Sequence, residues 1–256
     1  MSAEREGSRA LRLLCLHGYR QNADSFRARS GALRKALRRR AELLSVVAPH
    51  AVAAQQPQPG GEGGGGRGAL AQPHAVEGGE ELQALWHTRG EAASELLEAD
   101  SRGWWFSNPQ EETFNASEEA SSCTGLEESL DLVADAFVKY SPIDGLLGFS
   151  QGAALVGIIC ALKQRGDSRF PFDFAILIAG FKSRATPHQS YYQESITVPS
   201  LHVLGETDRV IPAEMSRELA SVFMEPVILT HPGGHFMPAS PPQKKAYLEF
   251  LNQFLK

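Results

Sequence analysis

The chain has 256 residues, of which 42% are hydrophobic and 21% charged, enough for one sizeable core in a single domain spanning residues 1–256. A formal net charge of −5 argues against a nucleic-acid partner, because such proteins usually present a basic face. No apolar run approaches the roughly 20 residues that a membrane span requires, and three cysteines without ligand-like spacing argue against a disulfide framework or a metal site. We expect a cytoplasmic or nuclear protein with reduced thiols, and we infer no obligate protein partner.

The first predicted elements are a strand, a helix and a second strand. Residues 11–16 form a short apolar run that ends at His17-Gly18, which is typical of a buried strand followed by a tight turn. Apolar residues at helical spacing follow over residues 26–37, and residues 43–47 predict another strand. A strand, a crossover helix and a strand together indicate the start of a parallel sheet.

The segment 51–99 interrupts this pattern as an insertion. Residues 51–68 consist mainly of Gln, Pro and Gly, so they offer almost nothing to bury and are expected to be disordered. Residues 80–99 are richer in Leu, Ala and Glu and favour a short, marginal helix. Order is expected to return at Trp104, where three adjacent aromatic residues begin.

From residue 126 onward, predicted helices and strands alternate regularly. The helices are expected over residues 126–137, 153–162, 214–222 and 247–254, and the strands over residues 145–149, 174–178, 200–204 and 227–230. Strands that are apolar on both faces and alternate with helices predict an α/β fold, with a doubly wound, mostly parallel sheet of about six strands flanked by helices. In such a sheet the catalytic groups should lie in loops just beyond the carboxyl ends of strands.

One of these strand-to-helix junctions carries a nucleophile pattern. Residues 148–152, Gly-Phe-Ser-Gln-Gly, fit G-x-S-x-G, which places a serine on a sharp, strained turn so that its hydroxyl projects from the sheet. The two glycines remove side chains that would collide where strand and helix converge. The bare pattern also arises by chance in a chain with 24 glycines, but its position between a strand and a helix favours Ser150 as the nucleophile.

A serine hydroxyl needs a general base near neutral pH. His231 and His235 both follow the last predicted strand, and His235 is favoured because two preceding glycines let the loop turn its ring back over the sheet. The orienting acid should follow the preceding strand, where Asp208 has a better reach than Glu206. The order Ser, Asp, His along the chain is that of α/β-hydrolases and differs from the orders in chymotrypsin and subtilisin.

Backbone amides are expected to stabilise the oxyanion. The amide of Gln151 begins the helix after the nucleophile, where the helix dipole supports negative charge. The amide of Tyr19 follows the first strand, and Gly18 before it would allow a close approach. The alternative for Tyr19 is an ordinary strand-to-helix turn.

These residues also carry a family resemblance. The segments 16–22 (LHGYRQN), 102–106 (RGWWF), 144–152 (DGLLGFSQG), 204–208 (LGETD) and 233–236 (GGHF) resemble the family of serine hydrolases, in its fungal LovG-like branch. The likeness covers nearly the whole chain except residues 51–99. It implies a single α/β-hydrolase domain with carboxylesterase activity on medium- to long-chain acyl or alkyl esters, and it carries the catalytic roles onto Ser150, Asp208 and His235. Because thioesterases occur in the family, the resemblance leaves the scissile bond open.

The expected mechanism is a two-step acyl transfer through an acyl-enzyme, on a small-molecule acyl ester and without a metal or organic cofactor. An acyl chain needs an apolar groove, and aromatic residues that flank the predicted strands are candidates to line it, with plain core packing as the alternative. These candidates are Trp104, Trp105, Phe106, Phe181, Tyr191 and Tyr192. Two other functions stay open: an acyl thioesterase with the same triad, and a non-catalytic binding module of the same fold, which the complete triad disfavours.

Overall fold

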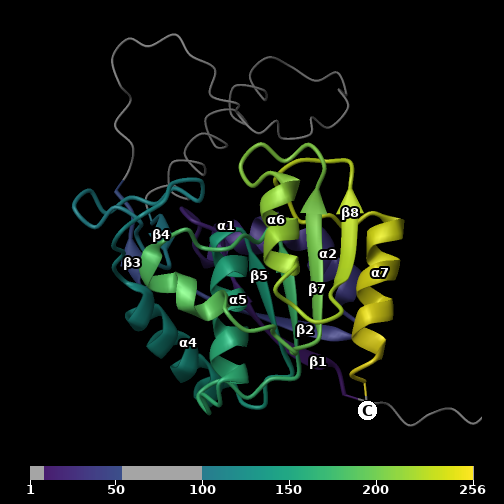
Figure 1. Cartoon of the computed structure of the whole chain (residues 1–256). Helices are drawn as coiled ribbons and strands as arrows, with labels where there is room; N and C mark the ends of the chain where they lie inside the picture. Colours follow the sequence, from purple (N-terminus) through teal and green to yellow (C-terminus); the bar gives the residue numbers. More distant parts are fainter. Residues whose placement is uncertain (1–8, 54–99, 256) are drawn as a thin grey trace, which may run out of the picture.

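The computed structural model describes residues 9–53 and 100–255, and a six-stranded sheet of order β2-β1-β5-β6-β7-β8 runs through it (Figure 1). Every strand pair in this sheet is parallel. Its strands are β1 (Leu11–Leu16), β2 (Ala41–Val46), β5 (Gly145–Phe149), β6 (Phe174–Ile178), β7 (Ser200–Gly205) and β8 (Val227–His231). The predicted doubly wound, parallel sheet of about six strands is therefore confirmed.

Helices cover both faces of the sheet (Figure 1). They are α1 (Ala23–Arg29), α2 (Gly31–Leu37), α4 (Leu126–Tyr140), α5 (Gln151–Gln164), α6 (Ala213–Ala220) and α7 (Pro241–Asn252), with a 3-10 helix η1 (Thr186–Tyr192). Helices α5 and α6 pack against β1, β5, β6 and β7, whereas α1, α2 and α7 contact β2 and β8. No helix within the described residues is both long and apolar enough to cross a membrane.

The chain between β1 and β2 forms two helices, where the sequence pattern predicts one. Helix α1 begins with a capping box in which Asn22 and Ser25 satisfy each other's backbone amides. It ends at Ser30, whose amide donates to the carbonyl of Phe26, and α2 starts at the next residue. Phe26 before this break and Leu33 after it are both fully buried, so the apolar spacing continues from one helix into the next. The spacing alone therefore does not reveal the break between the two helices.

The order of the strands positions the functional site. After β1 the chain crosses to the outer strand β2, then returns to place β5 on the other side of β1, where Leu16 pairs with Gly148. The loops that leave β1 and β5 therefore run in opposite directions. A crevice at the carboxyl ends of two such strands is the usual ligand site of an open α/β sheet.

The start of the insertion is part of the fold. Strands β3 (His50–Ala51) and β4 (Arg102–Gly103) form a small antiparallel sheet, and the amide of Val52 donates to the carbonyl of Ser101 at 2.8 Å. The disorder expected over 51–68 therefore does not begin at Ala51, because backbone pairing with Arg102 holds it in place. The rest of that segment and the helix expected over 80–99 lie outside the described residues.

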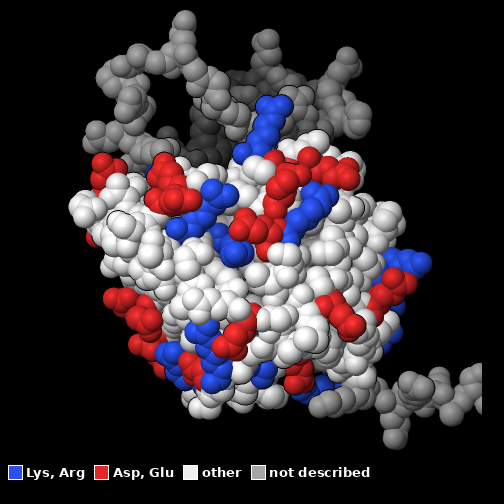
Figure 2. All heavy atoms as spheres, viewed as in Figure 1, with Lys and Arg blue, Asp and Glu red and all other residues white. Residues whose placement is uncertain are grey.

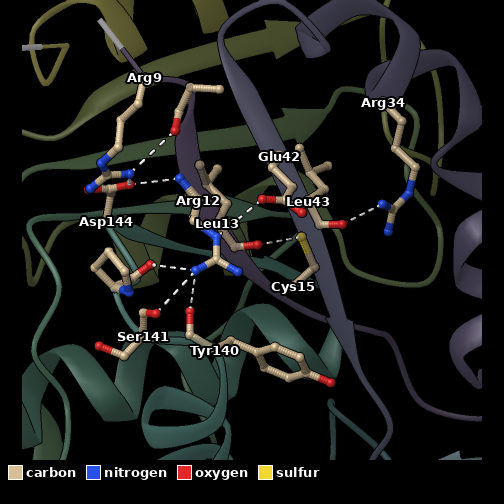
Figure 3. Close-up of polar contacts among 12 residues, drawn as sticks. Arg9, Arg12, Leu13, Cys15, Arg34, Glu42, Leu43, Tyr140, Ser141 and Asp144 are labelled. Carbon is tan, nitrogen blue, oxygen red and sulfur yellow. Dashed lines mark hydrogen bonds and ion pairs between the residues drawn. The ribbon is translucent and has the colours of Figure 1, made fainter.

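Arginines tie elements together at the amino end of the sheet (Figure 3). The guanidinium of Arg12 donates to the carbonyls of Tyr140 at 2.6 Å and Ser141 at 3.3 Å, where α4 ends. The carboxylate of Asp144 accepts hydrogen bonds from Nη1 and Nη2 of Arg9 and from the backbone amide of Arg12. A cation at the carboxyl end of a helix complements the helix dipole, so these contacts join α4 and β5 to β1.

The face in view carries charges of both signs. Figure 2 shows Lys and Arg side chains interspersed with Asp and Glu across this face. Their mixture gives this side of the molecule no continuous basic patch of the kind that binds nucleic acid.

Candidate active site

Ser150 occupies the sharp turn between β5 and α5. Its backbone has φ 54° and ψ −119°, a conformation that residues other than glycine rarely adopt. A Cβ at position 148 would lie 2.5 Å from the Cα of Ala153, and one at position 152 would collide with the carbonyl of Leu16. The two glycines are thus required by the close approach of β5, α5 and β1, which is the geometry of a nucleophile elbow.

The loops after β7 and β8 bring an acid and a base together. The Nδ1 atom of His235 lies 2.7 Å from the Oδ2 atom of Asp208, and the other carboxylate oxygen accepts the amides of Val210 at 2.8 Å and Ile211 at 2.9 Å. Burial by itself raises the pKa of Asp208. The hydrogen bond and charge of His235, together with the two amides, outweigh it and leave the pKa below its ordinary value. Asp208 is therefore held as a carboxylate that fixes the orientation of the ring.

The two competing residues lie elsewhere. His231 is buried at the end of β8, where its Nδ1 atom accepts the amide of Gly233 at 3.3 Å. Glu206 is exposed, and its amide donates to the carbonyl of His231. The structure thus brings Asp208 and His235 together and assigns His231 and Glu206 to the connection between the two loops.

The loop after β1, which carries the amide of Tyr19, passes beside Ser150. A Cβ on Gly18 would lie 3.3 Å from the Cβ of Ser150, so this loop passes directly against the elbow. Among the described residues the amides of Tyr19 and Gln151 have no hydrogen-bond acceptor, which leaves both free for an oxyanion.

His17 holds the peptide that carries the Tyr19 amide. The Nε2 atom of His17 accepts the amide of Ala48 at 3.0 Å, so Nδ1 carries the proton and donates to the carbonyl of Gly18 at 2.8 Å. Burial lowers the pKa of His17 to about 4, against the opposing effect of the Gly18 carbonyl. The neutral ring therefore fixes the Gly18–Tyr19 peptide plane.

A cavity of about 690 Å³ contains both Ser150 and His235. The described residues that line it, besides those two, are Gly18, Tyr19, Arg20, Gln21, Arg29, Ser101, Phe114, Asn115, Ala116, Phe149, Val210 and Ile211. Sequence reasoning missed Phe114 and the two arginines. Val210 and Ile211 could have been found, because they directly follow the predicted acid.

The six aromatic candidates for substrate binding do not line this cavity. Trp104 and Trp105 are fully buried, and Phe106, Phe181 and Tyr192 are buried as well, with Tyr191 partly exposed. Trp104 supports the site from behind, because its indole donates to the carbonyl of His17 at 2.7 Å. The side chain of Gln151 accepts the amide of Trp104 and donates to the carbonyl of Trp105. The six aromatic candidates thus belong to the core or pack against it, where large rings exclude water. Phe114 contacts Trp105 and lines the cavity, so it lies between the two.

A second polar cluster lies behind the aromatic layer. His188, which the sequence places in a polar loop, is buried and bridges Ser183 at 2.7 Å and the thiol of Cys123 at 3.0 Å. Burial lowers the pKa of His188 to about 4 and raises that of Cys123, so both groups are neutral. Within the described residues, no group of three or more His, Cys, Asp or Glu side chains is arranged to hold a metal ion.

Comparison with known proteins gives matches along nearly the whole chain. Residues 7–247 match the family described as Serine hydrolase (FSH1). Esterase OVCA2 of Xenopus tropicalis is 56% identical over 247 residues, which cover 96% of this chain and 94% of that protein. Esterase OVCA2 of Homo sapiens is 47% identical over 248 residues, covering 96% and 97%.

Solved structures share the fold at low sequence identity. Zea mays acyl-protein thioesterase 2 has a TM-score of 0.57 at 14% identity, over 99% of this chain and 97% of that chain. Esterase PE8 has a TM-score of 0.56 at 15% identity, over 97% and 94%. These similarities agree with the parallel sheet and flanking helices described above.

Proposed function

This chain belongs to the serine hydrolase (FSH1) family, as its motifs indicated, and on that premise we propose that it hydrolyses carboxylic esters with Ser150 as nucleophile. Its relatives at 45–56% identity are named esterases, which supports an ester as the substrate. One observation carries the assignment of the site. Ser150 and His235 line the same cavity, and His235 is held by Asp208 at 2.7 Å.

In the proposed mechanism, Ser150 attacks the ester carbonyl while the Nε2 atom of His235 removes its proton. The amides of Tyr19 and Gln151 hold the oxyanion of the tetrahedral intermediate. His235 then protonates the leaving alcohol, and an acyl-enzyme remains on Ser150. Water repeats the sequence to release the acid, and Asp208 keeps the ring oriented and stabilises its positive charge in both steps.

The substrate class follows from the cavity. Phe114, Val210 and Ile211 give it an apolar wall, and a volume of about 690 Å³ suits a ligand with a medium-length acyl or alkyl chain. A thioester would use the same groups and differ only in its leaving group. We propose the oxo-ester as the preferred bond, with the thioester as the second candidate, in a cytoplasmic or nuclear protein.

Labelling with a fluorophosphonate tests the catalytic assignment. The wild-type protein should label at one site, and Ser150→Ala should lose both labelling and most hydrolysis of p-nitrophenyl hexanoate, with only a small residual rate from the oxyanion donors. The exposed Ser221 provides a matched control, since Ser221→Ala should label fully. Full labelling of Ser150→Ala would show that another serine is the nucleophile. An unlabelled wild type would instead favour a non-catalytic binding module, and kinetics on matched oxo-ester and thioester substrates decide the bond.

A further inference from the structure

The wall of the catalytic cavity is cationic. Arg20 and Arg29 both line it, and none of the described lining residues is Asp or Glu. The chain as a whole carries a formal net charge of −5, whereas the described part of the cavity wall has two positive charges and no negative one. A positive concave wall attracts anions and concentrates them at the site.

Neither arginine is neutralised by an acidic residue of the described ranges 9–53 and 100–255. Asp100 directly precedes the lining residue Ser101, but its carboxylate forms an ion pair with Arg102 at 2.6 Å. Within the residues that the structure describes, neither Arg20 nor Arg29 forms an ion pair, whereas Arg9, Arg12 and Arg169 all do. Arg20 is partly buried against Tyr19 and Arg29 is exposed. A bound anion would give the partly buried Arg20 guanidinium the charged partner that its surroundings among the described residues lack.

The backbone at Arg20 gives a second, independent observation. Its φ is 61°, a left-handed conformation that costs a residue with a Cβ roughly 1–2 kcal/mol and that Gly or Asn adopts more easily. Backbone contacts hold it there, because its amide donates to the carbonyl of Arg102 at 2.8 Å. Its guanidinium lies 5.7 Å from the centre of the Tyr19 ring, which also lines the cavity. This chain thus has an arginine at a position where the backbone favours Gly or Asn.

We propose that this cavity selects esters that carry a negatively charged group, a carboxylate or a phosphate, and that Arg20 and Arg29 bind that group. The inference rests on the proposed esterase function and adds the substrate class. Arg20 directly follows Tyr19, whose amide would hold the oxyanion, so the proposed anion-binding residue and the oxyanion donor belong to the same loop. Arg29 lies at the exposed end of α1 and extends the positive wall outward, while Phe114, Val210 and Ile211 contact the apolar part of the same substrate.

The experiment compares charged and neutral esters of equal length. On the acyl side, p-nitrophenyl hydrogen adipate is compared with p-nitrophenyl hexanoate. On the alcohol side, 4-(hexanoyloxy)phenyl phosphate is compared with 4-methoxyphenyl hexanoate. Ser150→Ala supplies the background rate for each. We expect the anionic member of at least one pair to have a kcat/KM about tenfold higher, mainly through KM, and the arm that shows it tells which side of the ester carries the charge.

The variants assign this preference to the two arginines. Arg20→Asn keeps a residue that tolerates the left-handed backbone, so its Tm should not fall, and the ratio of kcat/KM between anionic and neutral esters should drop toward one. Arg29→Gln should lower the ratio less, because the side chain is exposed and screened by salt. Arg27→Gln, on the same helix and outside the cavity wall, is the matched control and should leave the ratio unchanged.

Two results would overturn the inference in distinguishable ways. Equal or better hydrolysis of the neutral ester in both pairs, with normal fluorophosphonate labelling, would remove the anion preference and leave the proposed esterase function intact. An unaltered ratio in the double variant Arg20→Asn, Arg29→Gln would show that another group selects the anion. Absence of hydrolysis and of labelling in the wild type would instead reject the esterase function itself.

Discussion

The arginines at the two ends of the sheet are used differently. At the amino end, Arg9 and Arg12 contact the carboxylate of Asp144 or the carbonyls where α4 ends (Figure 3). At the carboxyl end, Arg20 and Arg29 line the cavity beside Ser150 and form no ion pair with any residue the structure describes. The first group has its partners within the chain, and the second group leaves its charge available to a ligand.

This difference separates stability from function. A guanidinium with several acceptors inside the chain contributes to folding, and its removal leaves acceptors unpaired. A guanidinium in a cavity contributes little to folding until a ligand is present. Loss of the partly buried Arg12 side chain at the amino end should therefore lower stability and spare activity, whereas changes at the carboxyl end should lower activity and spare stability.

The largest effect is expected at the carboxyl end. His235→Ala removes the general base held by Asp208, so kcat should fall by about 10⁴-fold or more while the Tm changes little. The control is His231→Ala, which should retain activity within a few fold because its ring contacts the amide of Gly233 instead. Initial rates on p-nitrophenyl hexanoate and a thermal melt of each variant measure both quantities. An active His235→Ala with an inactive His231→Ala would reverse the assignment of the base.

The second prediction concerns pH. Burial lowers the pKa of His17 and of His188 to about 4 and that of His202 to about 3, so the folded protein keeps these three rings neutral between pH 6.5 and 4. The unfolded chain protonates them below about 6.5, and stability is therefore complete above that pH and falls as the pH drops, by about 1.4 kcal/mol per pH unit and histidine.

Urea unfolding at pH 7.0, 5.5 and 4.5 measures this dependence. His188→Asn should reduce the slope of the free energy of unfolding against pH by close to one proton, since one of the buried histidines is gone. Arg12→Ala at the other end should keep the wild-type slope, because a guanidinium does not titrate in this range. An unchanged slope in His188→Asn would mean that its ring is protonated in the folded state.

The smallest effect in this comparison is expected at the amino end. Arg12→Ala leaves the carbonyls of Tyr140 and Ser141 without their donor, and should lower the free energy of unfolding by about 1–3 kcal/mol. Activity should stay within twofold of wild type. Arg9→Gln is the matched comparison, because the Arg9 side chain is 56% exposed, and its Tm should equal that of wild type within error. A loss of activity in Arg12→Ala without a loss of stability would break the separation between the two ends.

Local pattern was sufficient for much of the fold and for the candidate triad. Short apolar runs between helical segments predicted the six strands, because the inner strands of a sheet covered on both faces must be apolar along their length. The edge strands β2 and β8 are partly exposed. G-x-S-x-G placed Ser150, because the crowded turn between strand and helix excludes side chains at 148 and 152. Asp208 and His235 followed from their positions after the last two strands, since parallel strands bring all such loops to one edge.

Other features depend on contacts between distant parts of the chain. Trp104 and Phe114 are both aromatic, yet the first is fully buried and the second lines the cavity. The contacts of Gln151 with the backbone of Trp104 and Trp105, and not the residue type, hold the tryptophans in the core and leave Phe114 at the cavity wall. Ala51 is held by its pairing with Arg102, across the insertion. His188 reaches Cys123 although 65 residues separate them.

The sequence by itself therefore determined the sheet, its order of elements and the three residues proposed to act on the ester. Each of these is encoded by residues close together in the chain or by the rule that parallel strands end at a common edge. Only the tertiary structure decided which side chains line the cavity and which arginines lack a partner. Burial and charge pairing arise from residues far apart in sequence. No local pattern at Arg20 could therefore show that it lines the same cavity as Ser150, or that the described lining of this cavity contains no carboxylate.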